Sequence, residues 1–440
     1  MYNIIKEIFS EKKMENFNLF IKDLKTLISY KSVKGKSEDG APFGAEIKNA
    51  LQFFLRRAKE LGLPTINYDN YMGEVFLGEG EEIGIIGHID VVPSGNGWNT
   101  DPFSLSEKDG TYYGRGLSDD KTPLLLCLYI LKELKDSKIP LTKKYRLFIG
   151  CDEESGWQDV EYAKTKTVFP SFGFSPDGDF PVSYAEKGMA IATFIFDKPK
   201  NFIDIKGGTV INAVCAFATL IAKDCGIDEK LLYKHNLMLK ENNVIESIGV
   251  SAHGSHPELG KNAIKPLLSY MCDLGEDYND AIDYLFNDKW GLNNIKTEQG
   301  NITLSPDVIK IENDKLKILC DVRFPAPITL DEIKTVFDKS GLCYDVSLKH
   351  DTQLVAKEGN LVSTLITAYN EITGNNSVPV SQSGSTFARV FPFGVAFGPE
   401  FPNENASIHE ANEHLSEKNL LLTYEIYKKA IFDLNGVEKL

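Results

Sequence analysis

The sequence predicts an α/β protein in which a mixed sheet flanked by helices is interrupted by an inserted α+β domain. Short β-rich runs (GEVFLG, IGIIGHIDVV and KYRLFIGCDEE) share the first part of the chain with helical patterns, and such alternation is typical of a layered, largely parallel sheet. The middle of the chain changes to amphipathic strands, and the last part returns to the first style. With 440 residues, the chain also exceeds what one hydrophobic core usually holds.

The elements follow from apolar spacing along the chain. We expect helices at residues 14–30, 45–62, 124–135, 260–274, 329–339, 360–373 and 416–434. The three runs above predict strands at residues 73–78, 83–92 and 144–154. A hairpin turn is expected at Asn313-Asp314, inside VIKIENDKLKILCDV. The domain boundaries follow as 1–186 for the first part, 187–351 for the insert and 352–440 for the last part.

The composition excludes some classes of partner. Forty-eight basic and sixty-three acidic residues give a formal charge of −15, which repels nucleic acid and anionic membranes. The N-terminus MYNIIKEIFSEKK does not match a secretory signal, and no apolar run is long enough to span a membrane. The seven cysteines form no CxxC pair, so most are expected to be buried apolar residues in a reducing compartment. We therefore predict a soluble cytoplasmic protein.

Five short segments place histidines and carboxylates where a strand or a turn would end. They are His88-Ile-Asp90, Gly114-Arg-Gly-Leu-Ser-Asp119-Asp120, Asp152-Glu153-Glu154, Pro176-Asp177 and Ile408-His409-Glu410. Ligands of such sheets gather beyond the carboxyl ends of the strands. A mixed oxygen and nitrogen donor set is selected by hard or borderline divalent metals. The segments together therefore indicate metal-assisted hydrolysis.

Each segment alone also has an ordinary structural interpretation. His88 and Asp90 point to the same face of a strand. Either His88 binds metal and Asp90 orients its ring, or His88 is only hydrogen-bonded at the end of the strand. Three consecutive acids repel one another unless cations neutralise them. One glutamate could bind metal while its neighbour acts as general base, and the residues alone do not decide between Glu153 and Glu154. Asp177 could cap a turn, and His409 could be an ordinary surface histidine.

Other catalytic patterns are absent from the sequence. GEGEEIG lacks the GxGxxG spacing and precedes its strand, and neither HExxH nor GxSxG occurs. Dinucleotide binding and two common hydrolase mechanisms therefore have no support in the sequence.

Longer motifs carry a resemblance over nearly the whole chain. They are GAPFG, GHIDVVPSGNGW, DPF, YYGRGLSDDK, DEESGW, PDGDFPVSYAEKG, SAHGSHPELGKNA, DVRFP, AFGPEFP and IHEANE. In this order they resemble the dinuclear zinc peptidases of the aminoacylase/carboxypeptidase superfamily, and within it the dipeptidase V branch of Xaa-His or carnosine-type dipeptidases. The resemblance implies a zinc-peptidase catalytic domain with an inserted α+β lid domain.

The resemblance also implies a role for each candidate residue. His88 and Asp177 would hold one ion, Glu154 and His409 the other, and Asp119 would bridge them. Asp90 would orient His88, and Glu153 would be the general base. In the lid, His253 would donate to the carbonyl oxygen of the scissile bond beside Asn212, and Arg323 would bind the substrate carboxylate. Gly384 and Ser385 belong to the loop that would line the substrate pocket.

The implied function is a dipeptidase that uses two divalent ions, zinc first and manganese or cobalt as alternatives, on dipeptides with a free N-terminal amine. The alternative is a deacylase of N-acyl amino acids in the same superfamily. A catalytically silent binding protein is disfavoured because Glu153 is retained beside Glu154. The expected partner is a small peptide, without nucleic acid or membrane, and the long insert predicts a monomer. Thr122, Asn212-Ala-Val-Cys215 and Gly384-Ser385 depart from the resembling pattern, so the sequence leaves the substrate preference open.

Overall fold

The computed structural model describes residues 14, 16–223, 227–402, 404 and 407–440. Contacts along the chain divide it into two compact units. Unit 1 comprises Met1–Tyr184, Val355–Val380 and Thr386–Leu440, and unit 2 comprises Ala185–Leu354 and Ser381–Ser385. The sequence placed the boundaries at 186/187 and 351/352 and did not separate residues 381–385 from the last part. The segment MYNIIKEIFSEKK and Cys225 lie outside the described residues.

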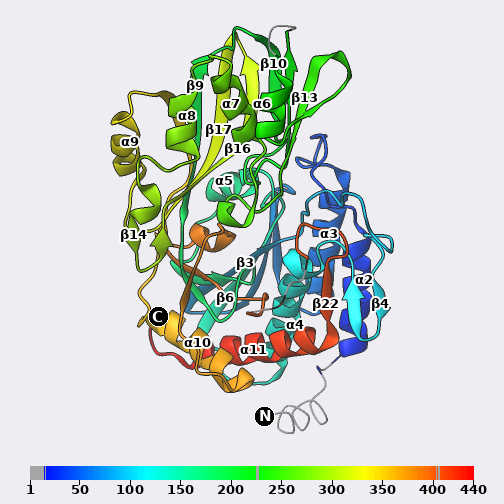
Figure 1. Cartoon of the computed structure of the whole chain (residues 1–440). Coiled ribbons are helices and arrows are strands. Elements are labelled where there is room, and N and C mark those ends of the chain that lie inside the picture. The colour runs from blue at the N-terminus through cyan, green and yellow to red at the C-terminus, as the bar shows by residue number, and fades with distance from the viewer. Residues whose placement is uncertain (1–13, 15, 224–226, 403, 405–406) are drawn as a thin grey trace. The chain divides into compact units, whose positions relative to one another are not determined.

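Unit 1 contains the first and last parts of the chain (Figure 1). Its helices are α2 (Phe17–Ser29), α3 (Ala45–Glu60), α4 (Thr122–Asp136), α5 (Gln158–Lys164), α10 (Asn360–Thr373) and α11 (Glu417–Gly436), with the short turns η1 (Leu117–Lys121) and η6 (Phe387–Val390). Its strands are β1 (Thr65–Tyr68), β2 (Met72–Gly78), β3 (Glu81–His88), β4 (Ser106–Lys108), β5 (Thr111–Tyr113), β6 (Lys143–Gly150), β7 (Phe172–Ser175), β21 (Phe393–Ala396) and β22 (His414–Ser416). The strand β20 (Val380–Gln382) begins in unit 1 and ends in unit 2. The strand β8 (Ser183–Glu186) leads from unit 1 into unit 2.

The main sheet of unit 1 is mixed. Its strand order is β1-β2-β6-β3-β7-β21-β8-β19, and β20 pairs with β8. The four central strands β6, β3, β7 and β21 run parallel, whereas β1, β2 and β8 pair antiparallel. The mixed sheet expected from the sequence is therefore confirmed, and its parallel strands lie in the centre. A second, three-stranded sheet has the order β22-β5-β4.

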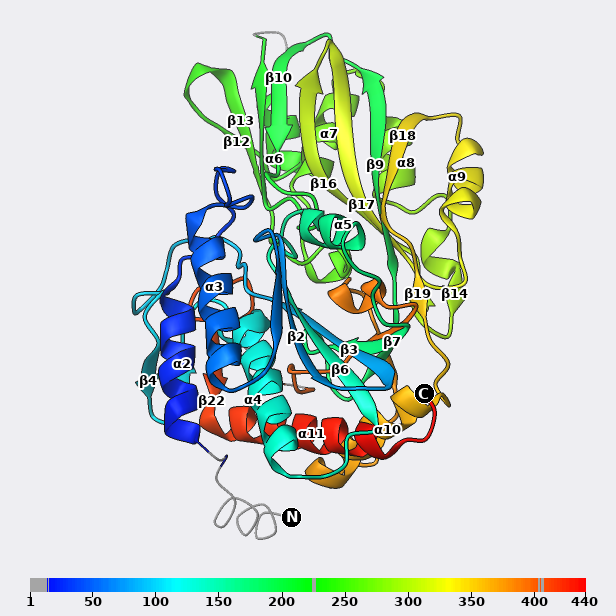
Figure 2. The same ribbon diagram turned by 180° about the vertical axis from the view of Figure 1, so that it is seen from behind.

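Most residues of the central strands are buried, as expected where both faces of a sheet are covered. Ile86 and Phe148 pack with residues of α5 and η6 in one buried cluster. Gly87, the next residue after Ile86, faces the opposite side of the sheet. α4 covers that side, since a Cβ on Gly87 would lie 3.1 Å from the side chain of Leu124. α11 packs on α4, and α3 packs on β1 and β2 (Figure 2). This double cover makes the ends of the central strands rigid supports.

Unit 2 is an antiparallel sheet with helices against one face. Its strands are β9 (Gly188–Asp197), β10 (Phe202–Gly207), β11 (Phe217–Ala222), β12 (Met238–Leu239), β13 (Val244–Ile248), β14 (Lys296–Thr297), β15 (Gly300–Asn301), β16 (Thr303–Glu312), β17 (Lys315–Phe324), β18 (Cys343–His350) and β19 (Gln353–Leu354). Its helices are α6 (Glu229–Lys234), α7 (Ile264–Asp273), α8 (Asn279–Leu285) and α9 (Leu330–Asp338), with short turns η3 (Glu241–Asn243), η4 (Pro257–Leu259) and η5 (Leu292–Asn294).

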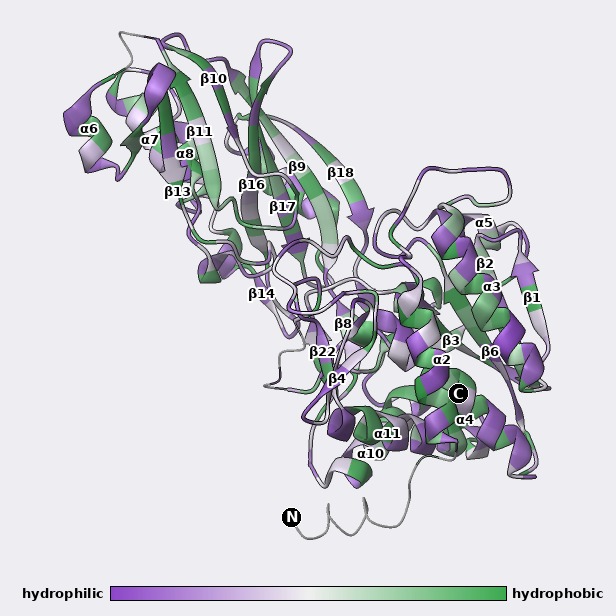
Figure 3. Ribbon diagram, turned by 90° about the vertical axis from the view of Figure 1, so that its right-hand side faces the viewer, coloured by the Kyte–Doolittle hydropathy of each residue, from purple (hydrophilic) through white to green (hydrophobic). Residues whose placement is uncertain are grey.

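The large sheet of unit 2 has the order β12-β13-β11-β10-β16-β17-β9-β18. Residues of β9 alternate between buried and half-buried, as expected for a sheet with one face in the core. The colouring of Figure 3 shows that the strands of this sheet contain both hydrophobic and hydrophilic residues. The expected hairpin joins β16 and β17, where Asn313 and Asp314 both have positive φ (52° and 58°), the backbone that a two-residue hairpin turn requires.

Two further observations concern the described residues. None of the helices among them has the length and apolar character needed to span a membrane. Their cysteines are all free, with Cys127, Cys151, Cys215 and Cys320 buried and Cys343 exposed.

Candidate active site

The candidate residues of unit 1 gather at one edge of the main sheet. His88 is the last residue of β3, Glu153 and Glu154 follow β6, and Asp177 follows β7. These three strands are neighbours and run parallel, so their carboxyl ends meet at the same edge. The sequence therefore placed these four side chains correctly at strand ends.

The acids and histidines form two groups. His88, Glu153 and Asp177 offer ligand atoms within 4.8 Å of one another, and so do Asp119, Glu154 and His409. These are the donor types that zinc and other borderline divalent ions take.

Asp119 lies between the two groups. Its Oδ1 is 2.9 Å from Nε2 of His88, and its Oδ2 is 2.9 Å from Nε2 of His409. His409 Nε2 is also 3.0 Å from Oε2 of Glu154, and His88 Nε2 is 3.7 Å from Oδ2 of Asp177. One carboxylate therefore faces both imidazoles, one with each oxygen.

The electrostatics of these groups fit bound cations. Burial, together with the charge of Asp119, raises the pKa of Asp177 to about 7 and also raises the pKa of Glu154. Burial alone would lower the pKa of His88, but the carboxylates of Asp119 and Asp90 raise it well above 6.5. His88 Nε2 is buried and finds no well-directed hydrogen-bond partner among the described residues, although it lies 2.9 Å from Oδ1 of Asp119. A divalent ion would neutralise the crowded acids and accept this nitrogen as a ligand.

The Asp90 carboxylate supports the glutamate turn. Its two oxygens accept hydrogen bonds from the backbone N–H of Glu153 (3.2 Å) and of Glu154 (3.1 Å). The ring of His88 contacts the backbone carbonyl oxygen of Asp90 at 3.0 Å through Nδ1, while the nearest carboxylate oxygen of Asp90 is 3.5 Å away. Asp90 thus contacts His88 through its backbone carbonyl oxygen and, at the longer distance, through its carboxylate, and the same carboxylate holds the backbone of the two glutamates.

Two further aspartates shape the same turn. Asp152 accepts a hydrogen bond from the backbone N–H of Gln158 (3.0 Å) and forms an ion pair with Lys34 (2.6 Å). Asp159 accepts from the backbone N–H groups of Cys151 (2.7 Å) and Asp152 (3.1 Å). The first of the three consecutive acids is therefore part of the turn, and only the second and third belong to the two groups.

The loop of Asp119 approaches β3 closely because residue 87 is a glycine. Oδ2 of the buried Asp120 accepts a hydrogen bond from the backbone N–H of His88 (3.1 Å). A Cβ on Gly87 would lie 2.1 Å from that same oxygen, a distance at which the carboxylate must move. Gly87 thus allows the direct contact between the loop and the strand.

A buried ion pair holds the same loop from the other side. Glu413 and Arg115 are each 1% exposed, and Oε2 of Glu413 accepts from Arg115 Nη1 at 2.7 Å. The same carboxylate accepts from the backbone N–H of Gly116 (3.0 Å) and of Ser118 (2.8 Å). A carboxylate with this many donors makes strong, charge-assisted hydrogen bonds.

The ion pair also reaches the segment of His409. Arg115 Nη2 donates to the carbonyl oxygen of Glu410 at 3.1 Å. His409 has a positive φ of 62°, a conformation that costs a non-glycine residue about 1–3 kcal/mol and persists only where neighbours enforce it. The Arg115–Glu413 pair thus joins the loop of Asp119 to the segment of His409. The sequence prediction did not include it, although its residues occur in the motifs YYGRGLSDDK and IHEANE.

In unit 2, Asn212 and His253 lie side by side. Residue 213 forms a β-bridge with His253, and the backbone N–H of Gly254 donates to the carbonyl oxygen of Asn212 at 2.6 Å. The backbone N–H of Ser255 donates to Nδ1 of His253 (3.2 Å), and the Ser255 hydroxyl lies 2.6 Å from the same nitrogen. Because Nδ1 accepts, a neutral His253 carries its proton on Nε2.

Arg323 is buried and already has a carboxylate partner. Its Nε lies 2.8 Å from Oδ1 of Asp321, and its Nη2 lies 3.0 Å from Oδ2. Its Nη1 donates to the carbonyl oxygen of Ser383 at 3.3 Å, beside Gly384 and Ser385. Asp321 was not among the residues chosen from the sequence. It fixes one edge of the guanidinium group and so sets the direction of the other edge.

Comparison with known proteins gives the family. Residues 84–433 match the model of peptidase family M20/M25/M40. The chain belongs to this family. As a member of it, the protein is a metallopeptidase, and the acid-rich edge of unit 1 offers two groups of side chains able to hold divalent metal ions.

Relatives of this M20-family chain include dipeptidases. It is 32% identical to the Beta-Ala-Xaa dipeptidase of Lactobacillus delbrueckii subsp. lactis, over 99% of each chain. Two solved structures share the fold: human carnosine dipeptidase 1 (TM-score 0.57, 13% identity, 96% of this chain and 97% of that one) and the aminoacylhistidine dipeptidase of Vibrio alginolyticus (TM-score 0.56, 13% identity, 96% and 98%). The predicted catalytic domain with an inserted domain is thereby confirmed.

Proposed function

We propose that two divalent ions act in this metal-dependent dipeptidase, one held by His88 and Asp177 and the other by Glu154 and His409, with Asp119 shared between them. The observation that supports this most directly is the position of Asp119, whose two oxygens each lie 2.9 Å from a different histidine. When bound, such ions polarise a peptide carbonyl and activate water for attack. Zinc is the proposed metal because imidazole and carboxylate donors suit it.

Glu153 is the proposed general base. The geometry alone offers both glutamates as ligands, since Glu153 groups with His88 and Asp177 while Glu154 groups with His409. The resemblance assigns Glu154 to the metal and Glu153 to proton transfer. In this role Glu153 accepts the proton of the attacking water and returns it to the leaving amine.

The proposed substrates are dipeptides with a free N-terminal amine. The Lactobacillus relative is named for dipeptides that begin with β-alanine, and none of the proteins compared above supports the deacylase alternative. We assign Arg323 to the substrate carboxylate, with the loop of Gly384 and Ser385 lining the pocket. Asn212 and His253 are assigned to the carbonyl oxygen, and the Nε2–H of a neutral His253 is a suitable donor.

Paired glutamine variants test the assignment. Glu153→Gln should lose roughly 10² to 10⁴-fold in kcat on a dipeptide such as β-Ala-His and keep both ions, since it loses a proton acceptor. Glu154→Gln should lose one ion, measured as metal content after dialysis. The reverse pattern would exchange the two roles. Wild-type protein loaded with zinc, manganese or cobalt that cleaves none of a panel of dipeptides would refute the function itself.

A monomeric state and a cytoplasmic location stay predictions. If each chain completes its own site, a mixture of His253→Ala and Glu153→Ala proteins should remain inactive under conditions of subunit exchange. Recovery of activity in the mixture would contradict the monomer.

A further inference from the structure

Strand β16 of unit 2 contains a bulge at Asp307. The register of its pairing with β17 shifts between Pro306 and Val308, so the pairing skips Asp307. The carbonyl oxygen of Pro306 accepts a hydrogen bond from Nδ2 of Asn262 (2.6 Å), a contact that holds the bulge in place. A bulge changes the direction of a side chain and often lies beside an active site. The direction of the Asp307 side chain is therefore set by the bulge.

The carboxyl group of Asp307 is fully buried and makes two hydrogen bonds. Its Oδ2 accepts from the backbone N–H of Asn212 at 3.0 Å, and its Oδ1 lies 2.5 Å from the hydroxyl of Ser305. Burial raises the pKa of Asp307 to about 7, because a charged carboxylate loses its hydration in the interior. Both the ionised and the protonated group can accept the N–H of Asn212, so this contact does not depend on the charge.

The residue that Asp307 holds has a strained backbone. Asn212 has a φ of 121°, a conformation that residues with a Cβ rarely adopt and that persists only where neighbours enforce it. Asp307 binds its N–H, and the N–H of Gly254 binds its carbonyl oxygen at 2.6 Å. Ala213 forms a β-bridge with His253. A displacement of Asn212 would therefore be transmitted to His253.

A close contact joins these two residues to the arginine assigned to the substrate carboxylate. A Cβ on Gly254 would lie 2.8 Å from Oδ2 of Asp321 and 3.0 Å from Cα of Asn212. The same Asp321 oxygen accepts from Nη2 of Arg323 at 3.0 Å. The segment of His253 thus packs directly between the backbone of Asn212 and the partner of Arg323.

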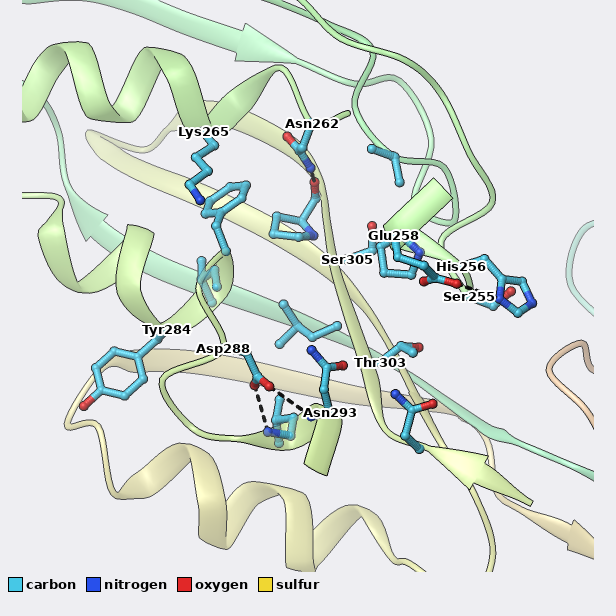
Figure 4. A pocket seen from close by; sticks show the side chains of 18 of the residues that line it. Ser255, His256, Glu258, Asn262, Lys265, Tyr284, Asp288, Asn293, Thr303 and Ser305 are labelled. Atoms are coloured by element: carbon cyan, nitrogen blue, oxygen red, sulfur yellow. Dashed lines mark hydrogen bonds and ion pairs between the residues drawn. The ribbon is translucent and has the colours of Figure 1, made fainter. Parts of the chain in front are cut away.

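The contacts that support Asn212 and His253 reach the wall of one pocket. Ser305, which contacts Asp307, and Ser255, which contacts the ring of His253, both line a cavity of about 610 Å³ and are labelled in Figure 4. A cavity of this size can hold a small molecule. Asp307 therefore supports a part of unit 2 that a ligand can enter.

We propose that Asp307 is a positioning residue of the dipeptidase, whose hydrogen bond to the N–H of Asn212 holds the strained backbone from which Asn212 and His253 act on the carbonyl oxygen of the scissile bond. The inference rests on the proposed function, which assigns these two residues to that oxygen, and adds the group that holds them. Donors of this kind act most strongly on the charge that develops in the transition state. Loss of their support should therefore lower kcat and change KM little.

The test is the kinetics of Asp307→Ala on β-Ala-His with the zinc-loaded full chain. We expect kcat to fall roughly 10- to 100-fold, less than the loss of an oxyanion donor itself, while KM changes by less than about threefold. Asp307→Asn keeps an oxygen that accepts the N–H of Asn212 and gains an NH₂ group that can donate to Ser305, so it should retain most of kcat. An unchanged kcat in folded Asp307→Ala would overturn the inference.

Glu276→Ala is the matched control for a general loss of stability. Glu276 is also a buried acid of unit 2, and it accepts from the backbone N–H groups of Lys200 (2.9 Å) and Asn201 (2.7 Å). These residues follow β9 at the end opposite to Met189, which is the residue paired with Arg323. The control should lose stability and keep the wild-type kcat. An equal loss of kcat in both variants would show that Asp307 only stabilises unit 2 and would overturn the inference.

Two further measurements separate positioning from other roles. Asp307→Ala should lower kcat by a smaller factor when Asn212 is already replaced by alanine, and losses that multiply in full would overturn the inference. Hydrogen exchange of the Asn212 amide in wild type needs no variant that folds. We expect strong protection, and exchange at the rate of an unbonded amide would also overturn the inference.

A failure of the proposed function would give a different pattern. If zinc-loaded wild type hydrolysed no dipeptide, or if Asn212→Ala and His253→Ala both kept the wild-type kcat, the assignments on which the inference rests would be refuted. If instead both of these variants lost kcat while Asp307→Ala kept it, the proposed function would stand and only the role of Asp307 would be overturned.

Discussion

Replacing Glu413 by glutamine should weaken one of the two proposed metal groups while leaving the other in place. The substitution keeps the volume of the side chain but turns one carboxylate oxygen into an NH₂ group. In the wild-type protein, Oε2 accepts from Arg115 and the N–H of Gly116, and Oε1 accepts from the N–H of Ser118. Whichever oxygen is replaced, the new NH₂ group would therefore face hydrogen-bond donors. The segment of His409 is joined to this ion pair, whereas the loop of Asp119 is also held from the other side by the hydrogen bond between Asp120 and His88, and His88 and Asp177 lie at strand ends.

The magnitude follows from the burial of the pair. The side chain of Arg115 is 2% exposed, and removing the partner of such a buried charge costs about 3–5 kcal/mol. A typical domain is stable by about 5–15 kcal/mol, so the variant should fold but melt roughly 5 to 10 °C lower. The strain of the His409 backbone would then be released, and the group of Asp119, Glu154 and His409 should lose its ion.

The measurements are metal content after dialysis, calorimetric titration with zinc, and thermal unfolding of the metal-free protein. We expect close to one tightly bound ion per chain, against two in wild type. Glu410→Gln is the matched control, because it makes the same change of charge in the same segment at an exposed residue and should retain both ions. A Glu413→Gln protein that binds two ions with wild-type affinity and melts within about 1 °C of wild type would refute the reasoning.

Four further outcomes are expected. Exhaustive chelation should abolish hydrolysis and lower the melting temperature, since binding to the folded state is lost, and full activity without metal would contradict two-ion catalysis. The Arg323→Ala enzyme should hydrolyse dipeptide amides and dipeptides at similar rates, because it lacks the group assigned to the substrate carboxylate. If it still preferred dipeptides as strongly as wild type, Arg323 would not bind that carboxylate. Nitrogen-15 NMR spectra should show that neutral His253 is the tautomer with its proton on Nε2, because the Ser255 N–H donates to Nδ1. A signal from an Nδ1–H group would contradict this. Burial raises the pKa of Asp307 to about 7, so its stabilising contribution is present near pH 4 and lost as the pH rises through 7; Asp307→Asn should flatten this decline in denaturant titrations.

Much of the fold was predictable because local patterns and tertiary structure agree. The expected helix at 360–373 is α10, and the hairpin at Asn313-Asp314 joins β16 and β17. The strand end at His88 and the acids that follow β6 were predictable because an apolar run that stops at an acid or imidazole marks the edge of a covered sheet. These signals are local, so one sequence suffices to detect them.

The supporting partners were not predictable in the same way. Asp321 is two residues from Arg323 on one strand, yet only the folded strand shows that their side chains pair. Arg115 and Glu413 are far apart in the sequence, and their contact depends on the pairing of β5 with β22. In the sequence, Asp152 looks like the two glutamates that follow it, because all three are acids after an apolar strand. Only its contacts with Lys34 and Gln158 show that it stabilises the turn.

The close contact between Gly87 and Asp120 bears on how activity is inferred for other chains with this set of residues. A single-base change can turn a glycine codon into one for alanine. At residue 87 the added methyl group would collide with the Asp120 carboxylate and displace the adjacent Asp119, although every proposed ligand would still be present in the sequence. A homologue with alanine at this position would thus lose catalysis even though its sequence still contained every proposed metal ligand. An inventory of metal-binding positions should therefore include this glycine before a chain of this type is judged active.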